Sequence, residues 1–276
     1  MKIRRLKINN FRAFGQFECE FEPGITVLTG LNSSGKTAVL KAIIVAAGQD
    51  RKIQTSDIRQ TRSSAGSGLI STEHHLPVNI EVWEDSDTDP ILVASRQKLK
   101  GRTSQAGYIG PICYYDSGRR NIDNPSPESL ALARQALDIV LEPVGWSNVR
   151  YIPGIDQICA DHDAQGTAPV AAIGGIGSVI DMVAGIAQQG SQLALIDGID
   201  LHLHPKWQQM ILPGLAAAFP DLQLIVTTHS PLVLSTVSRS QIRVLPDFGN
   251  GECATVPACE TLGKACDDLL TEAMGN

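Results

Sequence analysis

Short, continuous apolar runs recur along this chain, and longer segments with helical character follow them. The runs cover residues 25–28, 193–196 and 222–226, and such runs are typical of strands buried on both faces. Residues 38–44 and 206–218 follow two of these runs and are expected to form helices. The alternation of buried strands with helices predicts an α/β fold with a mostly parallel central sheet covered by helices.

The N-terminal part of the chain shows a different pattern, in which apolar and charged residues alternate. Residues 3–8 and 17–21 are expected to pair as a hairpin, and residues 78–83 and 91–95 as a second pair across an acidic turn. These strands predict an antiparallel β layer beside the parallel sheet. Four basic residues near the start are expected to face solvent on an edge strand, and a nucleic-acid patch is the alternative. They are Lys2, Arg4, Arg5 and Lys7.

Residues 51–145 form a short insert between the first predicted helix and the second half of the chain. Residues 51–75 are polar and rich in serine and glycine, which predicts an excursion over the surface, and residues 98–105 predict a second, basic loop. Ser126, followed by proline and glutamate, is the expected cap of a helix that ends before Pro143.

The second half of the chain adds smaller elements to the predicted α/β core. Residues 146–160 are expected to form short strands, and residues 174–177 a glycine-rich turn that leads into a helix. A closing helix is expected around residues 264–274. We expect one domain over residues 1–276.

The composition limits the classes of protein to which the chain can belong. Its 276 residues, of which 43% are hydrophobic, can bury a full core. The formal net charge of −6 argues against polyanion binding over the whole surface, but a local basic patch stays open. The apolar stretch 169–187 carries Asp181 and several glycines, so we expect no membrane contact. Six scattered cysteines without a Cys-x-x-Cys pair, and the lack of an apolar signal segment, predict a cytoplasmic protein with reduced thiols.

The segment from Gly30 to Thr37 fits the phosphate-binding loop pattern G-x-x-x-x-G-K-[ST], between a predicted strand and a predicted helix. Gly30 and Gly35 allow the backbone N–H groups to approach phosphates closely. Lys36 supplies a cation for the outer phosphates, and the Thr37 hydroxyl can ligate Mg²⁺. A glycine-serine turn with a surface lysine is the alternative, but the context favours binding of a nucleoside triphosphate.

Two more predicted strand ends carry candidates for the same site. Ligands of open parallel sheets bind beyond the carboxyl ends of the strands. Asp197 directly follows a buried strand, where a carboxylate can complete the Mg²⁺ shell opposite Thr37. His229 ends the next strand, before the helix cap Ser230, and is expected to face the γ-phosphate. A turn-forming aspartate and a core histidine are the structural alternatives.

The order of the motifs resembles that of AAA-family ATPases of the ABC/SMC/RecF-like class, which includes OLD-like ATPase heads. The resemblance rests on the segments "NFRAF", "GLNSSGKT", "YYDSGRR", "LALIDGIDLHLHP", "TTHSP" and "GKACDDLLTEAMG". It implies a P-loop NTPase with an ABC-type head over residues 1–276, in which two copies sandwich two ATP molecules. His229 would be the switch histidine. The resemblance also implies that Arg12 reaches the nucleotide. Together with the loop, this gives the expected contacts with ATP as Arg12, Gly30, Asn32, Ser33, Ser34, Gly35, Lys36, Thr37 and Ala38.

Two positions depart from the family pattern. Gly198 stands where the family has a glutamate that polarises the attacking water, and glycine cannot orient or deprotonate water. The segment 172–175 stands where the family has Leu-Ser-x-Gly, and its Ile173 offers no hydroxyl. Asp200, His202 and His204 have a spacing that can bind zinc, but the family resemblance accounts for this stretch.

Two functions therefore remain open. The first is an ATPase whose head-to-head dimer controls a partner acting on DNA, in genome maintenance or anti-phage defence, often with a separately encoded nuclease. The second is a scaffold or sensor that holds ATP and hardly turns it over, which Gly198 favours. An OLD-type nuclease would require a further Toprim domain. A small-molecule kinase would leave the segments "LHLHP" and "TTHSP" without a role.

Overall fold

The computed structural model describes residues 2–48, 78–84, 90, 92–96, 103–106, 111–116, 125–172, 175–246, 253–258 and 260–264. The chain divides into two compact units. Unit 1 consists of Met1–Phe21, Gly30–Ile109 and Val244–Thr255, and unit 2 of Glu22–Thr29, Gly110–Arg243 and Val256–Asn276. Neither the predicted excursion at residues 51–75 nor residues 265–274 of the predicted closing helix lie within the described part of the chain.

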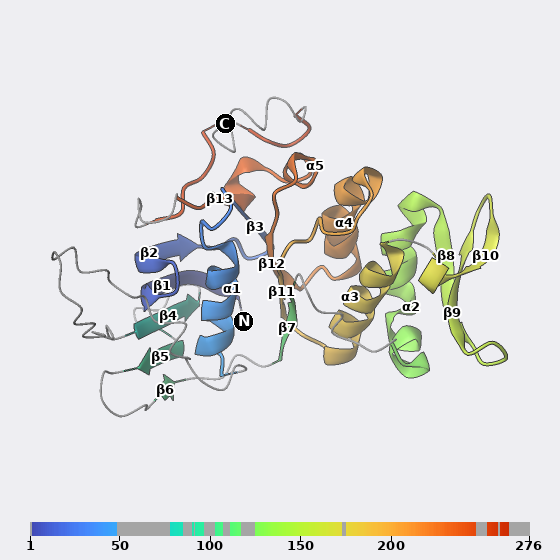
Figure 1. Ribbon diagram of the computed structural model, residues 1–276, viewed down its shortest axis with the longest axis horizontal. Coiled ribbons are helices and arrows are strands. Elements are labelled where there is room, and N and C mark those ends of the chain that lie inside the picture. The colour runs from blue at the N-terminus through green and yellow to red at the C-terminus, as the bar shows by residue number, and fades with distance from the viewer. Residues whose placement is uncertain are drawn as a thin grey trace, which may run out of the picture. The chain divides into compact units, whose positions relative to one another are not determined.

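Unit 1 is an antiparallel sheet with one helix packed against it (Figure 1). The strand order is β2-β1-β4-β5-β6, and helix α1 contacts β1, β4 and β5. The bounds are β1 Ile3–Phe11, β2 Phe14–Glu20, β4 Val78–Glu84, β5 Leu92–Arg96, β6 Thr103–Ala106 and α1 Lys36–Ala46. Apolar and polar residues alternate along these strands because one face of the sheet is buried and the other is more exposed to solvent. The predicted antiparallel layer is confirmed.

Two details of unit 1 differ from the sequence-based expectations. Strand β1 is not an edge strand, because β2 pairs on one side of it and β4 on the other. The Arg5 guanidinium donates a hydrogen bond to the Glu18 carboxylate and also lies over the Trp83 ring, 5.1 Å from its centroid. Residues 103–106, expected to lie partly in a basic loop, form strand β6, which pairs with β5.

Unit 2 contains the predicted parallel sheet, with strand order β13-β3-β12-β11-β7. Strands β3, β12, β11 and β7 run parallel and are almost entirely buried. Their bounds are β3 Ile25–Thr29, β12 Gln223–Thr227, β11 Leu193–Ile196, β7 Ile112–Tyr115 and β13 Ile242–Val244. Since parallel strands point the same way, their carboxyl ends share one edge of the sheet.

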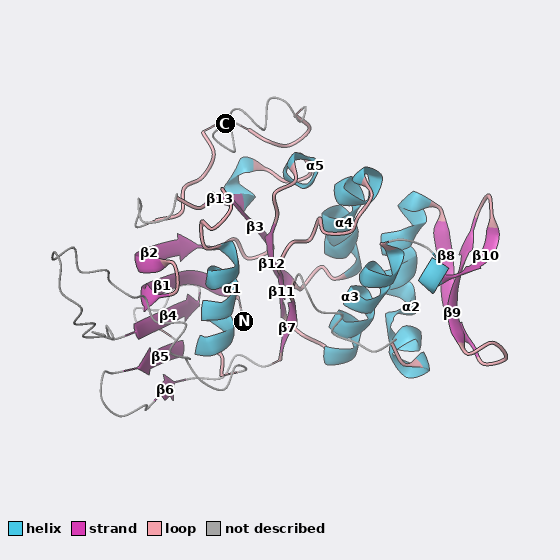
Figure 2. Ribbon diagram, in the orientation of Figure 1, coloured by secondary structure: helices cyan, strands magenta, loops and turns pink. Residues whose placement is uncertain are grey.

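The helices of unit 2 include a packed group of three, with α2 in contact with both α3 and α4 (Figure 2). The bounds are α2 Pro127–Leu141, α3 Ile176–Gln189, α4 Pro205–Ala218 and α5 Pro231–Leu234, with 3₁₀ turns at Glu142–Val144, Val170–Ala172 and Arg239–Gln241. The Ser126 hydroxyl accepts a hydrogen bond from the Ser129 N–H at 3.2 Å, which confirms the predicted cap. Ile176 and Gly177, expected in a glycine-rich turn, belong to α3. Within the described residues, no helix is both long and apolar enough to cross a membrane.

A second antiparallel sheet in unit 2 extends the strands expected near residues 146–160. Its order is β10-β9-β8, with bounds β8 Trp146–Ile152, β9 Gln157–His162 and β10 Gly166–Pro169. Asp161 joins these strands, because it accepts hydrogen bonds from Arg150 and Asn148 on β8 and from Thr167 on β10. These donors, Arg150 first, hold the pKa of the Asp161 carboxyl well below its usual value.

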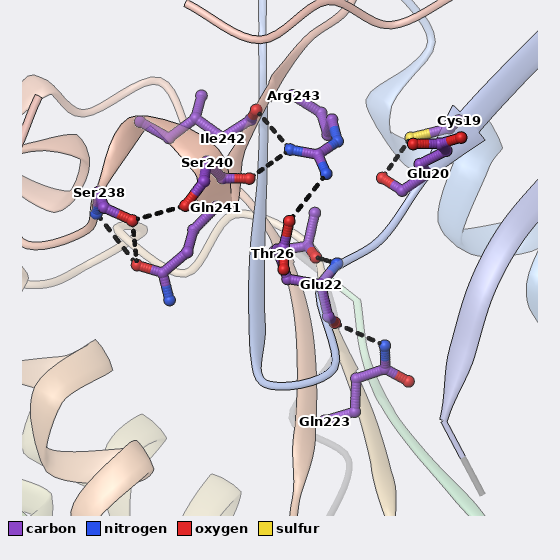
Figure 3. Close-up of polar contacts among 10 residues, drawn as sticks. All are labelled: Cys19, Glu20, Glu22, Thr26, Gln223, Ser238, Ser240, Gln241, Ile242 and Arg243. Carbon is purple, nitrogen blue, oxygen red and sulfur yellow. Dashed lines mark hydrogen bonds and ion pairs between the residues drawn. The ribbon is translucent and has the colours of Figure 1, made fainter. Parts of the chain in front are cut away.

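The start of β3 is fixed by polar contacts to its neighbouring strands (Figure 3). The buried guanidinium of Arg243, a residue of β13, lies 3.4 Å from the Glu22 carboxylate and donates a hydrogen bond to the Ser240 carbonyl. The Gln223 side chain at the start of β12 donates to the Glu22 carbonyl at 2.8 Å. These contacts hold the strand that leads directly into the segment Gly30–Thr37.

Candidate functional site

The phosphate-binding loop begins at Gly30, directly after β3, and ends in the first turn of α1. Gly30 has φ +137° and Gly35 has φ +100°, a region that glycine adopts more readily than other residues. A Cβ atom on Gly30 would lie 2.9 Å from the Leu245 carbonyl oxygen, and one on Gly35 would lie 2.4 Å from Phe14 Cζ. Both glycines are therefore required by the backbone conformation and by the space around them.

Lys36 is held inside the curve of this loop. The residue is only 8% exposed, and its Nζ donates hydrogen bonds to the carbonyls of Gly30 at 3.0 Å and Leu31 at 2.8 Å. Ser34 is also buried, whereas Asn32 and Ser33 are exposed. The loop thus places one ammonium group close to its own backbone and leaves its tip open to solvent.

The first turn of α1 carries Thr37 and Ala38. Thr37 is half-buried and Ala38 is buried. The helix has Gly35 as its N-cap, without a side-chain capping bond, and has no acidic residue in its first turn. The N–H groups and the dipole at the start of a helix favour an anion, and Lys36 adds a positive charge. The loop and helix end therefore fit a phosphate group.

The β1–β2 hairpin contributes a side chain that sequence reasoning missed. Phe14 packs against Gly35 and stacks on Phe17, with ring centroids 4.2 Å apart. Arg12 lies in the turn of this hairpin with φ +49°, and its guanidinium is 5.6 Å from the Phe11 ring centroid. The aromatic residue two positions after Arg12 was visible in the sequence, but its partner Gly35 was not.

In unit 2, Asp197 follows β11 at the carboxyl edge of the parallel sheet. The residue is 8% exposed, and its N–H donates to the Tyr115 carbonyl at 2.8 Å. Its Oδ1 accepts a hydrogen bond from the Thr227 hydroxyl at 2.7 Å. The same hydroxyl accepts from the Gly198 N–H at 2.7 Å. Thr227, which the sequence did not single out, therefore orients the carboxylate and the residue that follows it.

Gly198 has φ +70°, in the left-handed region. Its neighbour Ile199 donates its N–H to the Thr227 carbonyl at 3.0 Å, so both residues are tied to the end of β12. A glutamate at position 198 would adopt this backbone only with strain or would move it. The departure from the family pattern therefore coincides with a backbone conformation that favours glycine.

His229 is exposed at the end of β12, between the buried residues Thr228 and Ser230. Ser230 caps α5, with its hydroxyl accepting from the Leu232 N–H at 3.2 Å, as its position before Pro231 predicted. At the end of β7, Tyr115 donates its hydroxyl to the Met182 carbonyl at 3.0 Å. Burial, followed by the nearby Cys113 thiol, raises the pKa of Tyr115, so its hydroxyl remains a donor.

Comparison with known proteins supports the resemblance that the sequence motifs suggested. A family model described as an AAA domain matches residues 5–130, and a second AAA-domain model matches residues 178–235. The retron Vc95 probable ATPase of Vibrio cholerae serotype O1 biovar El Tor is 46% identical over 81 residues, 29% of this chain and 16% of that protein. The SMC head domain from Thermotoga maritima has a TM-score of 0.60 at 16% identity, over 88% of this chain and 94% of that chain.

These matches support an ABC/SMC/RecF-like ATPase, the class that the sequence motifs resemble. The DNA replication and repair protein RecF of Lactococcus lactis subsp. lactis is 28% identical over 136 residues, 49% of this chain. This chain spans 16% of the length of the retron relative and 35% of that of RecF. The likeness to the SMC head shows that the fold is that of an ABC-type head, as predicted.

The segments 172–175 and 200–204, which the sequence singled out, lie partly within the described residues. Gly175, with φ +82°, is the N-cap of α3, and a Cβ atom there would lie 2.6 Å from the His202 carbonyl oxygen. Ile173 and Gly174 lie outside the described residues. The His204 side chain caps α4 by accepting from the Lys206 N–H at 3.3 Å. Among the described residues, no group of three or more His, Cys, Asp or Glu side chains is arranged to hold a metal ion.

Proposed function

We propose that this head binds ATP at the segment Gly30–Thr37. The main support is the conformation of the loop, with its two left-handed glycines and the buried Lys36 ammonium. These features provide backbone N–H groups and one positive charge where a triphosphate would lie. Arg12, Asn32, Ser33, Ser34 and Ala38 complete the proposed nucleotide contacts, as the loop sequence and the family resemblance suggest.

We also propose that Thr37 and Asp197 hold Mg²⁺ and that His229 contacts the γ-phosphate. Three observations support this arrangement: β3 leads directly into the loop, β3 runs parallel to the strands that end at Asp197 and His229, and the Thr227 hydroxyl orients the Asp197 carboxylate. Bound Mg²⁺ would neutralise charge that develops on the phosphate oxygens. The residues of this chain would supply its ligands and orient the phosphates.

Nucleotide affinity tests the proposed binding directly. Lys36→Ala is expected to raise the Kd for ATP by about 100-fold, because it removes a buried charge from the loop. Lys41→Ala is the matched control, since Lys41 lies on the same helix outside the loop, and its Kd is expected to change by less than about 2-fold. Calorimetric titration with Mg-ATP measures both. Equal affinities in the two variants would exclude the loop as the nucleotide site.

For the cellular role, we propose that ATP-dependent pairing of two heads controls a partner that acts on DNA. The relatives named as a DNA replication and repair protein and as a retron ATPase support genome maintenance or anti-phage defence. A separately encoded nuclease or another effector is the expected partner, and DNA is a further proposed ligand. Sedimentation with a slowly hydrolysed ATP analogue is expected to double the mass of the wild type and not of Lys36→Ala. A mass that is independent of nucleotide would contradict head pairing.

Gly198 favours a second candidate function, a scaffold or sensor that holds ATP without rapid turnover. The residue carries no side chain that could position water, and its φ of +70° suits glycine. In this alternative, binding and head pairing are retained while hydrolysis is absent. Measuring ATP turnover beside ATP affinity separates the two functions.

A further inference from the structure

Two hydrogen-bonded pairs of side chains fix the backbone on either side of His229. On one side, the Thr228 hydroxyl donates to the Asp200 carboxylate at 2.5 Å and accepts from the Ser230 N–H at 2.9 Å. On the other side, the Ser230 hydroxyl donates to Gln208 Oε1 at 2.6 Å. These bonds hold the backbone on both sides of His229, whose side chain is exposed.

Gln208 also holds the loop that contains Asp200. Its Nε2 donates to the Leu203 carbonyl at 2.9 Å. A carbonyl can only accept, so this bond determines which end of the Gln208 amide faces Leu203 and which faces Ser230. One side chain on α4 therefore connects residues 200–204 to the segment that carries His229.

We propose that Asp200 and Gln208 are positioning residues that set the orientation of His229 and couple it to residues 200–204. The two pairs, Asp200–Thr228 and Gln208–Ser230, are called the His229 clamp. Leu201, 41% exposed, and the exposed His202 form the outer part of the same loop. The catalytic part of this inference rests on the proposed role of His229 at ATP.

The variant Gln208→Glu tests the clamp with a small change. Glutamate still accepts from the Ser230 hydroxyl, but it places a carboxylate oxygen against the Leu203 carbonyl, which cannot donate. It is expected to lower kcat for ATP by about 10-fold while the Kd for ATP changes by less than about 2-fold. Gln209→Glu is the matched control, because Gln209 is exposed on the same helix and the charge change is identical. The control is expected to keep the kcat of the wild type.

A double-mutant cycle shows whether Gln208 acts through His229. In a His229→Ala background, Gln208→Glu is expected to change kcat by less than about 2-fold, because the positioned group is absent. If the fold-changes in kcat caused by Gln208→Glu and His229→Ala multiply in the double variant, the two residues act independently and the proposal is overturned.

A readout that requires no turnover separates the clamp from ATP hydrolysis. The imidazole NMR signal of His229, identified by its loss in His229→Ala, is expected to shift in Gln208→Glu and not in Gln209→Glu. An unshifted signal in Gln208→Glu would overturn the clamp. If the wild type does not hydrolyse ATP, proposed hydrolysis fails while this spectrum still decides the clamp. Should Gln208→Glu not fold, Ser230→Ala removes the hydroxyl that bonds Gln208, and the same shift is expected.

Discussion

The loop Gly30–Thr37 and the loop that follows β11 both use a left-handed glycine after a buried strand, but for different physical reasons. Two features require glycine at position 35. Its φ of +100° disfavours other residues, and a Cβ atom there would lie 2.4 Å from the Phe14 ring. Gly198 is favoured by φ +70°, whereas the N–H that it donates to the Thr227 hydroxyl could come from any residue except proline. The first loop keeps every residue of its family motif, whereas the second has exchanged a side chain with a chemical role for a backbone conformation. Neighbouring atoms and backbone conformation both require glycine at position 35, whereas the observation that favours glycine at position 198 is its φ.

Gly35→Ala is expected to have the largest effect on stability. The new Cβ atom forces the Phe14 ring or the loop to move, and the left-handed backbone adds strain, for a combined loss of about 3 kcal/mol. Chemical denaturation measures this loss, and Mg-ATP affinity is expected to fall with it. Gly154→Ala is the control, since a Cβ atom there meets nothing within 4 Å. Equal stability of the two variants would contradict the close packing at Gly35.

Thr227→Val tests the second loop through the hydroxyl that orders it. Valine keeps the shape but leaves the Asp197 carboxylate and the Gly198 N–H without this partner, for an expected loss of about 1–3 kcal/mol. Thr255→Val, at an exposed threonine, is expected to cost less than about 0.5 kcal/mol. Urea denaturation compares the two. A loss confined to the control position would show that Thr227 does not organise this loop.

Gly198→Glu is expected to cost about 1 kcal/mol, less than Gly35→Ala, because the left-handed backbone conformation opposes it. Gly198→Asn is expected to cost less than Gly198→Glu, since asparagine tolerates the left-handed region better. Thermal denaturation orders the two. If asparagine is the more costly replacement, side-chain space and not φ explains the glycine.

The smallest effect concerns Asp161, which lies in neither loop. Its folded-state pKa is lowered by hydrogen bonds from Arg150, Thr167 and Asn148, below the ordinary value of 3.8. A lowered folded-state pKa contributes stability above the unfolded-state pKa, and this contribution is lost as the pH falls through the folded-state pKa. Asp161→Asn is therefore expected to flatten the acid side of the stability curve and to leave ATP affinity unchanged. Denaturation midpoints at pH 3 and pH 7 measure the difference, and an unchanged pH dependence would contradict it.

Local patterns predicted most of the parallel core. The apolar runs indicated β3, β11 and β12, and Ser126 indicated the start of α2, because burial and capping act over a few residues. The internal position of β1 could not be predicted in the same way, since its second partner β4 begins at Val78. The antiparallel sheet β8–β10 was anticipated only as short strands up to residue 160.

The candidate site also has a part that the sequence predicts and a part that only the fold reveals. The sequence motif singles out Lys36 and Asp197 by residue type and spacing. The contacts that fix their surroundings, Phe14 with Gly35 and Thr227 with Asp197, join residues far apart in the chain, so they required the fold. Gly198 was visible as a missing glutamate, but its positive φ was not.

Mg-dependent ATP turnover by the wild type and by Lys36→Ala, with ATP affinity determined on the same samples, tests the central claim most directly. We predict that the wild type binds ATP and hydrolyses it slowly, that Lys36→Ala raises the Kd by about 100-fold and abolishes turnover, and that Gly198→Glu raises the rate. Binding without turnover in the wild type, with turnover appearing in Gly198→Glu, would replace the ATPase by the scaffold. Binding and turnover that survive Lys36→Ala would contradict the account.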